Sequence, residues 1–241
     1  MKKQLLFSLA TALCVVSACT PLEKINLREE KLLVSLSRGA CFGRCPIYDF
    51  TVYESGIATF EGERFTPKLG TWIRELPDSD MRKLRDQLQE TNLWQYAPSY
   101  PSRLSDAPQI TITQYEDGAQ KTVTGKDGRP APVLMLQDLL ERLAQSDKEE
   151  WTVREEFDYG LPEGATPGEI FVQLSPNVYA RNWVQRYARQ DLRIAETLPE
   201  RSNFYRMTFD PTVAFPREIE RYLSYDEAVI DYSFFKPNER N

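Results

Sequence analysis

Residues 48–63 read YDFTVYESGIATFEGE and contain two strand-like runs on either side of a turn. Tyr48 to Tyr53 and Ile57 to Glu63 are rich in the β-branched and aromatic residues that favour strands. Glu54-Ser55-Gly56 separates the two runs, and Gly56 can take the positive φ that a tight turn requires. The stretch therefore predicts an antiparallel hairpin.

The hairpin lies within a longer run of predicted strands and helices. Further strands are expected at residues 32–37 and about 69–75, and residues 109–115 and 119–124 should form a second hairpin around Glu116-Asp117-Gly118. A helix should open at Pro77, because Met81, Leu84 and Leu88 recur at helical spacing. A second helix is expected from about Pro132. Antiparallel strands with helices on one face predict an α+β unit with an antiparallel sheet and two helices.

The C-terminal part has a second, compact pattern. Its expected elements are a strand at 169–174, a helix at 179–189, strands at 192–198 and 203–209, a helix at 216–223 and a strand at 228–235. This βαββαβ order is the split βαβ, or ferredoxin-like, arrangement. The sequence thus predicts a small ferredoxin-like domain after the first unit.

The N-terminus has the three-part plan of a secretory signal. Lys2 and Lys3 precede an apolar run that is shorter than the roughly 20 residues of a membrane span. Ser17-Ala18-Cys19 then resembles the lipobox of bacterial lipoproteins. The resemblance implies acyl chains such as palmitate on Cys19, removal of the signal, and attachment to a membrane. Thr20 favours the outer membrane, facing the periplasm; an ordinary secretory signal with a chance cysteine is the alternative.

The expected organisation follows from these patterns. Residues 1–18 form the signal peptide, 19–30 a polar tether, 31–145 the first α+β domain, 146–168 a linker rich in acids, Pro and Gly, and 169–241 the ferredoxin-like domain. Net charge is −6, without a long charged block, so neither nucleic acid nor an anionic lipid surface is expected as a partner.

The chain has no histidine, which excludes Ser/His/Asp and Cys/His nucleophile pairs and imidazole zinc sites. Carboxylate chemistry remains open, but the paired acids Glu149-Glu150 and Glu155-Glu156 fall in the expected linker, where solvated charge is the ordinary explanation. We therefore expect no enzymatic activity, no catalytic residue, no metal and no cofactor.

Cys41 and Cys45 are the cysteines left once the signal is removed and Cys19 is lipidated. The three residues between them include Gly43, which lets the chain turn back far enough for a disulfide. An exported protein meets an oxidising compartment, so the spacing favours a structural disulfide. A redox pair and a metal site are the alternatives.

The same segment reads C-F-G-R-C-P-I-Y from Cys41 to Tyr48. It resembles an uncharacterised family of bacterial domains of unknown function, marked by C-F-G-x-C-P-x-Y and often found in lipoproteins. The resemblance covers about residues 31–145 and implies no activity.

The C-terminal unit resembles the inhibitory propeptides of subtilisin-type proteases. This resemblance rests on the strand EIFVQL, the stretch 192–210 and the strand near Asp226 to Tyr232. It implies a tail that occupies a protease cleft, and no protease sequence follows here, so inhibition would act in trans. The expected partner-binding tail residues are Phe234, Phe235, Lys236, Pro237 and Asn238.

Two functions are expected from these features. The first is a lipid-anchored, non-enzymatic envelope module that binds another envelope protein. The alternative is a trans-acting inhibitor or chaperone of a subtilisin-like serine protease.

Overall fold

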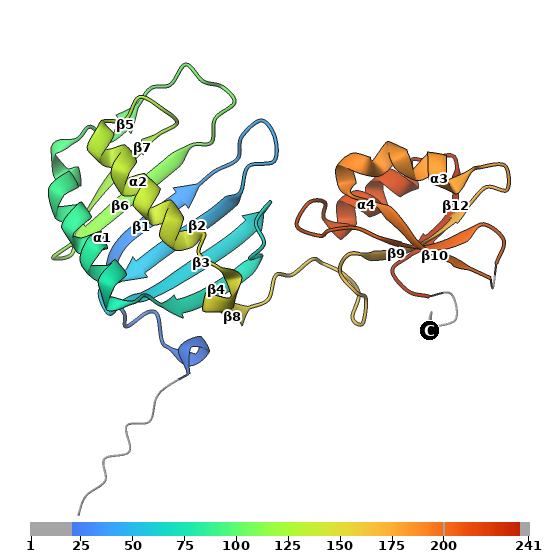
Figure 1. The fold of residues 1–241 in the computed structure, drawn as a ribbon, viewed down its shortest axis with the longest axis horizontal. Coiled ribbons are helices and arrows are strands. Elements are labelled where there is room, and N and C mark those ends of the chain that lie inside the picture. Colours follow the sequence, from blue (N-terminus) through green and yellow to red (C-terminus); the bar gives the residue numbers. More distant parts are fainter. Residues whose placement is uncertain (1–20, 200, 237–241) are drawn as a thin grey trace, which may run out of the picture.

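The computed structural model describes residues 21–199 and 201–236, which form two units joined by an extended segment (Figure 1). The described residues hold four α-helices and twelve strands in two sheets. The α+β prediction is confirmed.

The first unit is built on an eight-stranded sheet with the order β5-β7-β6-β1-β2-β3-β4-β8. Its strands are β1 (Leu32–Arg38), β2 (Ile47–Tyr53), β3 (Ile57–Arg64), β4 (Gly70–Glu75), β5 (Ser99–Tyr100), β6 (Ile110–Glu116), β7 (Ala119–Gly125) and β8 (Thr152–Glu155). All neighbours are antiparallel except β5 and β7. Both expected hairpins are present, and the second turns at Asp117 and Gly118, whose φ angles of 48° and 80° suit a type I′ turn.

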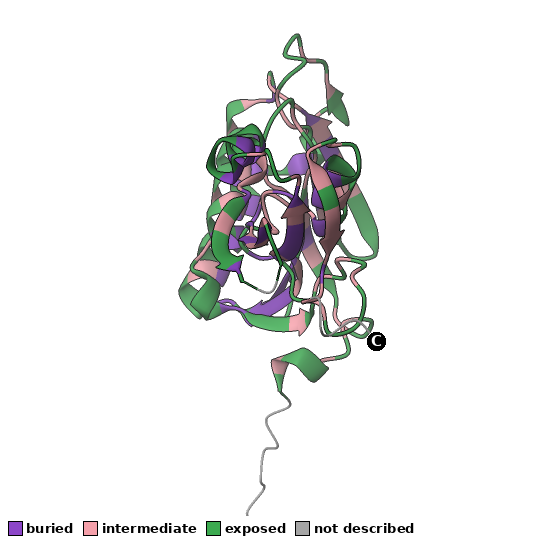
Figure 2. Cartoon of the chain, turned by 90° about the vertical axis from the view of Figure 1, so that its right-hand side faces the viewer, coloured by how far each residue is buried: buried purple, intermediate pink, exposed green. Residues whose placement is uncertain are grey.

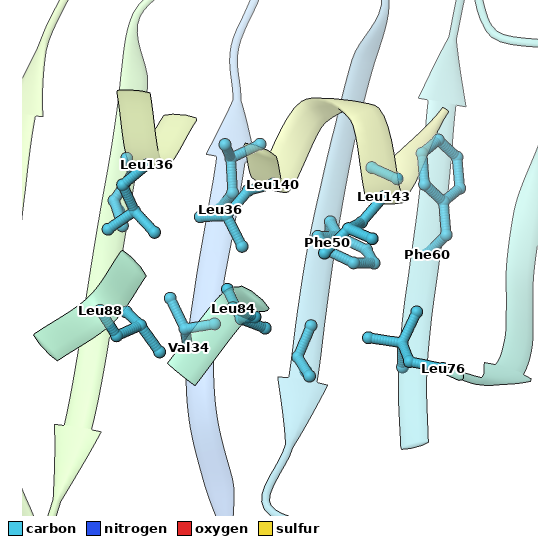
Figure 3. Packing of buried hydrophobic residues seen from close by; sticks show 14 of the residues in the cluster. Val34, Leu36, Phe50, Phe60, Leu76, Leu84, Leu88, Leu136, Leu140 and Leu143 are labelled. Carbon is cyan, nitrogen blue, oxygen red and sulfur yellow. The ribbon is translucent and has the colours of Figure 1, made fainter. Parts of the chain in front are cut away.

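Helices α1 (Asp78–Thr91) and α2 (Ala131–Ala144) cover one face of this sheet (Figures 1 and 3). Figure 3 shows leucines of both helices directed at Val34, Leu36, Phe50 and Phe60 on three central strands. Buried residues gather between the helices and the sheet, whereas loops and outer helix faces are exposed (Figure 2). Removal of this apolar surface from water is the main stabilising term of the first unit.

The opposite face of the sheet is partly covered by the N-terminal segment. A 3-10 helix at Leu22–Lys24 begins this segment, and Leu22, Ile25 and Leu27 pack against Tyr53, Ile57 and Ile73. The expectation of a free tether over residues 19–30 therefore differs from the structure at residues 22–27. The three apolar side chains of this segment cover an apolar surface that is formed by strands distant in sequence.

The linker was expected to begin at residue 146, but in the structure the first unit continues through β8 to Glu155. Trp151 is 6% exposed and belongs to the main core, with its ring in edge contact with Phe50 and Phe60. The next residues form β8, which pairs with β4 at the sheet edge. The first unit thus extends to Glu155, because a large aromatic side chain at this point completes its core.

The second unit has an antiparallel sheet with the order β10-β11-β9-β12. Its elements are β9 (Glu169–Leu174), α3 (Ala180–Trp183), β10 (Arg193–Leu198), β11 (Phe204–Thr208), α4 (Pro216–Ser224) and β12 (Val229–Ser233). Both helices contribute to one core with Ile170, Val172 and Leu174 of β9, so they cover one face. The helix expected at 179–189 is α-helical over four residues and continues as a 3-10 helix over Val184–Gln190.

The two units contact each other through the loop after β3 and the start of α4. The Arg64 guanidinium lies 4.9 Å from the Phe215 ring centroid and 2.5 Å from the Glu218 carboxylate. Phe157 of the connecting segment packs against Phe215, with 5.3 Å between the two ring centroids. Burial raises the pKa of Glu218, but hydrogen bonds from Arg64 and the Phe215 N–H outweigh burial and lower it overall.

We expect Trp151→Ala to lower the free energy of unfolding of the first unit by about 3 kcal/mol or more, because it empties a core position. Urea denaturation measures the change. The matched control is Trp94→Ala, since Trp94 is 40% exposed and its loss should cost far less. Equal, small effects of both substitutions would place Trp151 in a linker after all.

Candidate functional site

The loop between β1 and β2 is closed by a disulfide between Cys41 and Cys45, with 5.8 Å between the Cα atoms. The predicted pairing is present in the structure. The loop is also tied to the segment before β6, because the Gly39 N–H donates to Gln109 O at 2.9 Å and the Phe42 N–H to Asp106 O at 3.2 Å. A covalent bond and two backbone hydrogen bonds therefore fix this loop.

The disulfide loop presents an aromatic side chain to solvent. Phe42 is 88% exposed, the most exposed of the large hydrophobic side chains in the described residues. Leu104, on the segment that the loop contacts, is 53% exposed. We call Phe42, Leu104 and the loops 39–46 and 101–109 that carry them the loop surface.

Cationic side chains accompany these apolar ones. Arg44 and Arg103 are exposed, and the half-buried Lys126 donates to Ser105 O at 2.7 Å. Asp106 is the one acidic residue in the sequence of loops 39–46 and 101–109. The loop surface therefore has an excess of positive charge on a chain whose net charge is −6.

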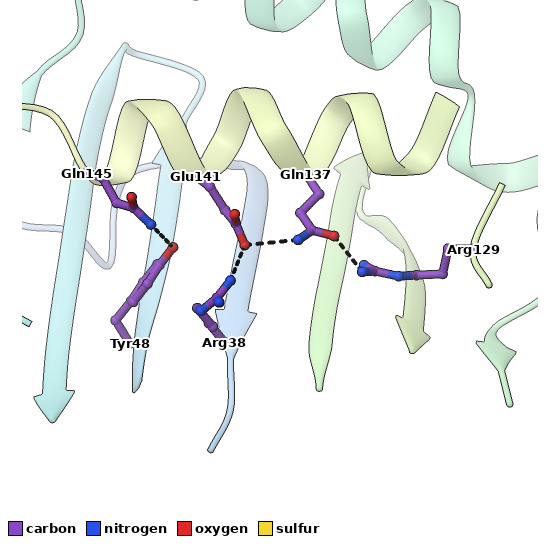
Figure 4. A network of polar contacts seen from close by, with 6 residues as sticks. All are labelled: Arg38, Tyr48, Arg129, Gln137, Glu141 and Gln145. Carbon is purple, nitrogen blue, oxygen red and sulfur yellow. Dashed lines mark hydrogen bonds and ion pairs between the residues drawn. The ribbon is translucent and has the colours of Figure 1, made fainter. Parts of the chain in front are cut away.

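A polar network beneath the loop holds both of its ends against α2 (Figure 4). Arg38, which ends β1, pairs with Glu141 at 2.5 Å, and Gln137 donates to the same carboxylate at 2.9 Å. On β2, the Tyr48 hydroxyl accepts from Gln145 at 3.4 Å. Burial raises the pKa of Tyr48, so its hydroxyl stays protonated at neutral pH.

The most enclosed carboxylate of the second unit has a structural role. Asp226 accepts from Trp183 Nε1 at 2.9 Å, the Tyr187 hydroxyl at 2.5 Å and the Ala228 N–H at 2.9 Å, and pairs with Arg186 at 3.1 Å. Burial raises its pKa, but the hydrogen bonds outweigh burial and lower it overall. Asp226 therefore stays ionised and joins α3 to the turn before β12.

The expected tail residues do not share one environment. Phe234 is 8% exposed and belongs to the core of the second unit, so its side chain is not available to fill a cleft. Phe235 and Lys236 are half-buried. Pro237 and Asn238, like Cys19, lie outside the described residues.

Within residues 21–199 and 201–236, no helix is long and apolar enough to cross a membrane. The same part of the chain holds no group of three or more His, Cys, Asp or Glu that could bind a metal ion.

Sequence reasoning identified the disulfide but not the loop surface. The available signal was the position of Phe42 between two bonded cysteines, because so short a loop has no interior in which to bury an aromatic ring. The polar network of Figure 4 could not be recognised in the sequence, because its residues come from four separate segments: β1, β2, α2 and the segment before α2.

Comparison with known proteins gives one match. Residues 32–144 match a family model described as a domain of unknown function, DUF6438. No curated protein and no solved structure matches the chain. The first unit from β1 to α2 is therefore similar to an uncharacterised domain family, as its cysteine motif indicates, and β8 completes the sheet beyond the matched residues.

Proposed function

We propose that this chain is a lipid-anchored protein of the bacterial cell envelope that binds another envelope protein and catalyses no reaction. The observation that carries the binding proposal is the exposed Phe42 side chain on a disulfide-closed loop.

The energetics of an exposed, fixed aromatic side chain favour binding. Full burial of a Phe side chain contributes about 1.5–3 kcal/mol. The disulfide and the two backbone hydrogen bonds already fix the loop, so binding orders few additional groups. Aromatic anchors surrounded by polar residues are typical of the residues that dominate protein interfaces.

The charge around Phe42 defines the chemistry of the partner. Arg44, Arg103 and Lys126 favour an acidic surface through charge complementarity. Leu104 extends the apolar contact beside Phe42. We therefore propose a partner protein with an apolar pocket bordered by carboxylates.

The N-terminal segment and the loop surface lie at opposite ends of β1. The N-terminal segment leads into β1 at Leu32, and the disulfide loop follows the end of β1 at Arg38 (Figure 1). Seven residues of strand span about 20 Å. A lipid on Cys19 would thus leave the loop surface on the side of the first unit that is distant from the membrane.

The non-enzymatic part of the proposal is supported by the roles of the enclosed carboxylates. Glu141 is held by Arg38 and Glu218 by Arg64. Asp226 accepts from four groups of its own unit. Each of these carboxylates joins two elements of the fold, which is a structural use of charge.

We expect a photo-crosslinking residue at position 104 to capture a partner in intact cells. Phe42→Ala should then lower the crosslink yield about tenfold, since it removes about 1.5 kcal/mol or more of apolar contact. The matched control is Tyr225→Ala, because Tyr225 is an 83% exposed aromatic residue of the second unit. Equal yields from both variants, or no crosslink in the wild type, would contradict the proposal.

Cys19→Ser should release the protein from the membrane, because the thiol is the proposed acyl acceptor. Metabolic labelling with a fatty-acid analogue, followed by membrane fractionation, measures the change. The control is Cys14→Ser, which alters the signal but not the acceptor. A Cys19→Ser protein that keeps the label would refute the lipid assignment.

The second candidate is a trans-acting inhibitor or chaperone of a subtilisin-like serine protease. Supporting it is the antiparallel order β10-β11-β9-β12, with α3 and α4 on one face, which a ferredoxin-like propeptide requires. Because Phe234 is buried, a tail that binds a protease cleft would have to begin after Phe234.

Deletion of residues 236–241 should then weaken inhibition sharply without altering the fold, because an extended tail would bind in the substrate groove. Inhibition constants for a panel of subtilisin-like proteases, with and without the tail, measure this. Digestion of the intact protein by every protease of the panel would exclude this candidate.

A further inference from the structure

A cavity of about 310 Å³ lies below the disulfide loop, between the sheet and the end of α2. Its lining includes Pro46, Tyr48, Phe60, Lys68, Gln145 and Ser146. Ligand sites in proteins have volumes of about 300 Å³ or more, and they combine apolar walls with a few well-placed polar groups. The cavity therefore has the size and composition of a site for a small molecule.

The position of Lys68 depends on a glycine in β3. The loop after β3 folds back over Gly62, where an added Cβ would lie 1.7 Å from the Lys68 carbonyl oxygen. No other residue type fits this approach of two backbones. The loop places Lys68 against the core, where it is 2% exposed.

The Lys68 ammonium lies between aromatic rings, 4.8 Å from the Phe60 centroid and 5.0 Å from that of Trp151. It donates to the Ser146 carbonyl at 3.0 Å. An ammonium has three N–H groups and carries a full charge. Ring faces and one carbonyl solvate it only in part.

Two carboxylates lie near Lys68: Asp147 lines the same cavity, and Glu150 is already paired. Glu150 forms an ion pair with Arg74, whose guanidinium also donates to the Ser146 hydroxyl. Within the described ranges, 21–199 and 201–236, no carboxylate lies at ion-pair distance from Lys68 Nζ. Lys68 is thus a buried charge beside a second cation, an arrangement that is costly without an anion.

We propose that this cavity binds a small carboxylate ligand with an apolar or aromatic body, and that the carboxylate pairs with Lys68. The apolar body would contact Pro46, Phe60 and Pro67, which line the cavity. This site shares Pro46 with the loop surface, but neither Phe42 nor Leu104 lines it. It therefore goes beyond the protein-binding function, and each can be tested without the other.

The surroundings of Lys68 give the site a characteristic pH dependence. Burial, together with Arg74 on β4 and Lys148 after α2, lowers the pKa of Lys68, while Glu150 and Asp147 raise it; the net result is a pKa of about 8. A bound carboxylate favours the ammonium and raises this pKa. Binding therefore takes up a proton above about pH 8, and affinity should fall about tenfold per pH unit from there.

The test is titration of the purified full chain with benzoate, followed by NMR, with neutral benzamide as the matched ligand control. We expect benzoate to bind at millimolar concentration or below at pH 7, benzamide to bind at least tenfold more weakly, and benzoate affinity to fall between pH 8 and 9.5.

Lys68→Met should abolish benzoate binding and keep the fold, because it removes a buried charge and retains the apolar stem. Lys83→Met is the control, since Lys83 is an exposed lysine of α1 paired with Asp80. Failure of benzoate to bind, equal binding of benzamide, pH-independent affinity in the wild type, or binding that survives Lys68→Met would each overturn the proposal.

Discussion

The stacking of Tyr48 on Phe60 is the interaction on which the rest of the first unit depends. The two rings lie 4.8 Å apart at their centroids, and each residue is 1% exposed. The Tyr48 hydroxyl reaches Gln145 at the end of α2, so one side chain joins β2, β3 and the helix. Arg38 does the same for β1 through Glu141. Both ends of the disulfide loop are therefore held by α2, and Phe42 projects from a fixed base.

The same residues separate the two proposed sites. On the outer side, Phe42 is exposed on a surface that also carries Arg44 and Arg103, which suits a protein surface. On the inner side, Pro46 and Tyr48 form part of a cavity that is shared with Lys68. The outer site needs a rigid, exposed loop, whereas the inner one needs an enclosed cation without a direct carboxylate partner. A single short segment, residues 41–48, supplies both because the disulfide forces its chain to turn directly above the core.

Sequence reasoning succeeded where the structure depends on local chemistry. Gly56 and Asp117-Gly118 identified both hairpin turns because positive φ angles restrict the residue types. It failed where contacts are distant in sequence. Trp151 was assigned to a linker, since its acidic neighbours conceal a core position that β2 and β3 create. Leu22, Ile25 and Leu27 were assigned to a tether for the same reason. The cysteine pair was predictable from its spacing, but the exposure of Phe42 and the burial of Lys68 follow from the loops that surround them.

The central claim is that the loop surface is covered by a partner in the envelope. Hydrogen exchange of the protein isolated with its crosslinked partner, compared with the purified protein, measures this coverage at each amide. The account predicts slower exchange at residues 39–46 and 101–109 in the complex and unchanged exchange around Tyr225 and Ile230, two exposed apolar positions of the second unit. Protection confined to the second unit would contradict it.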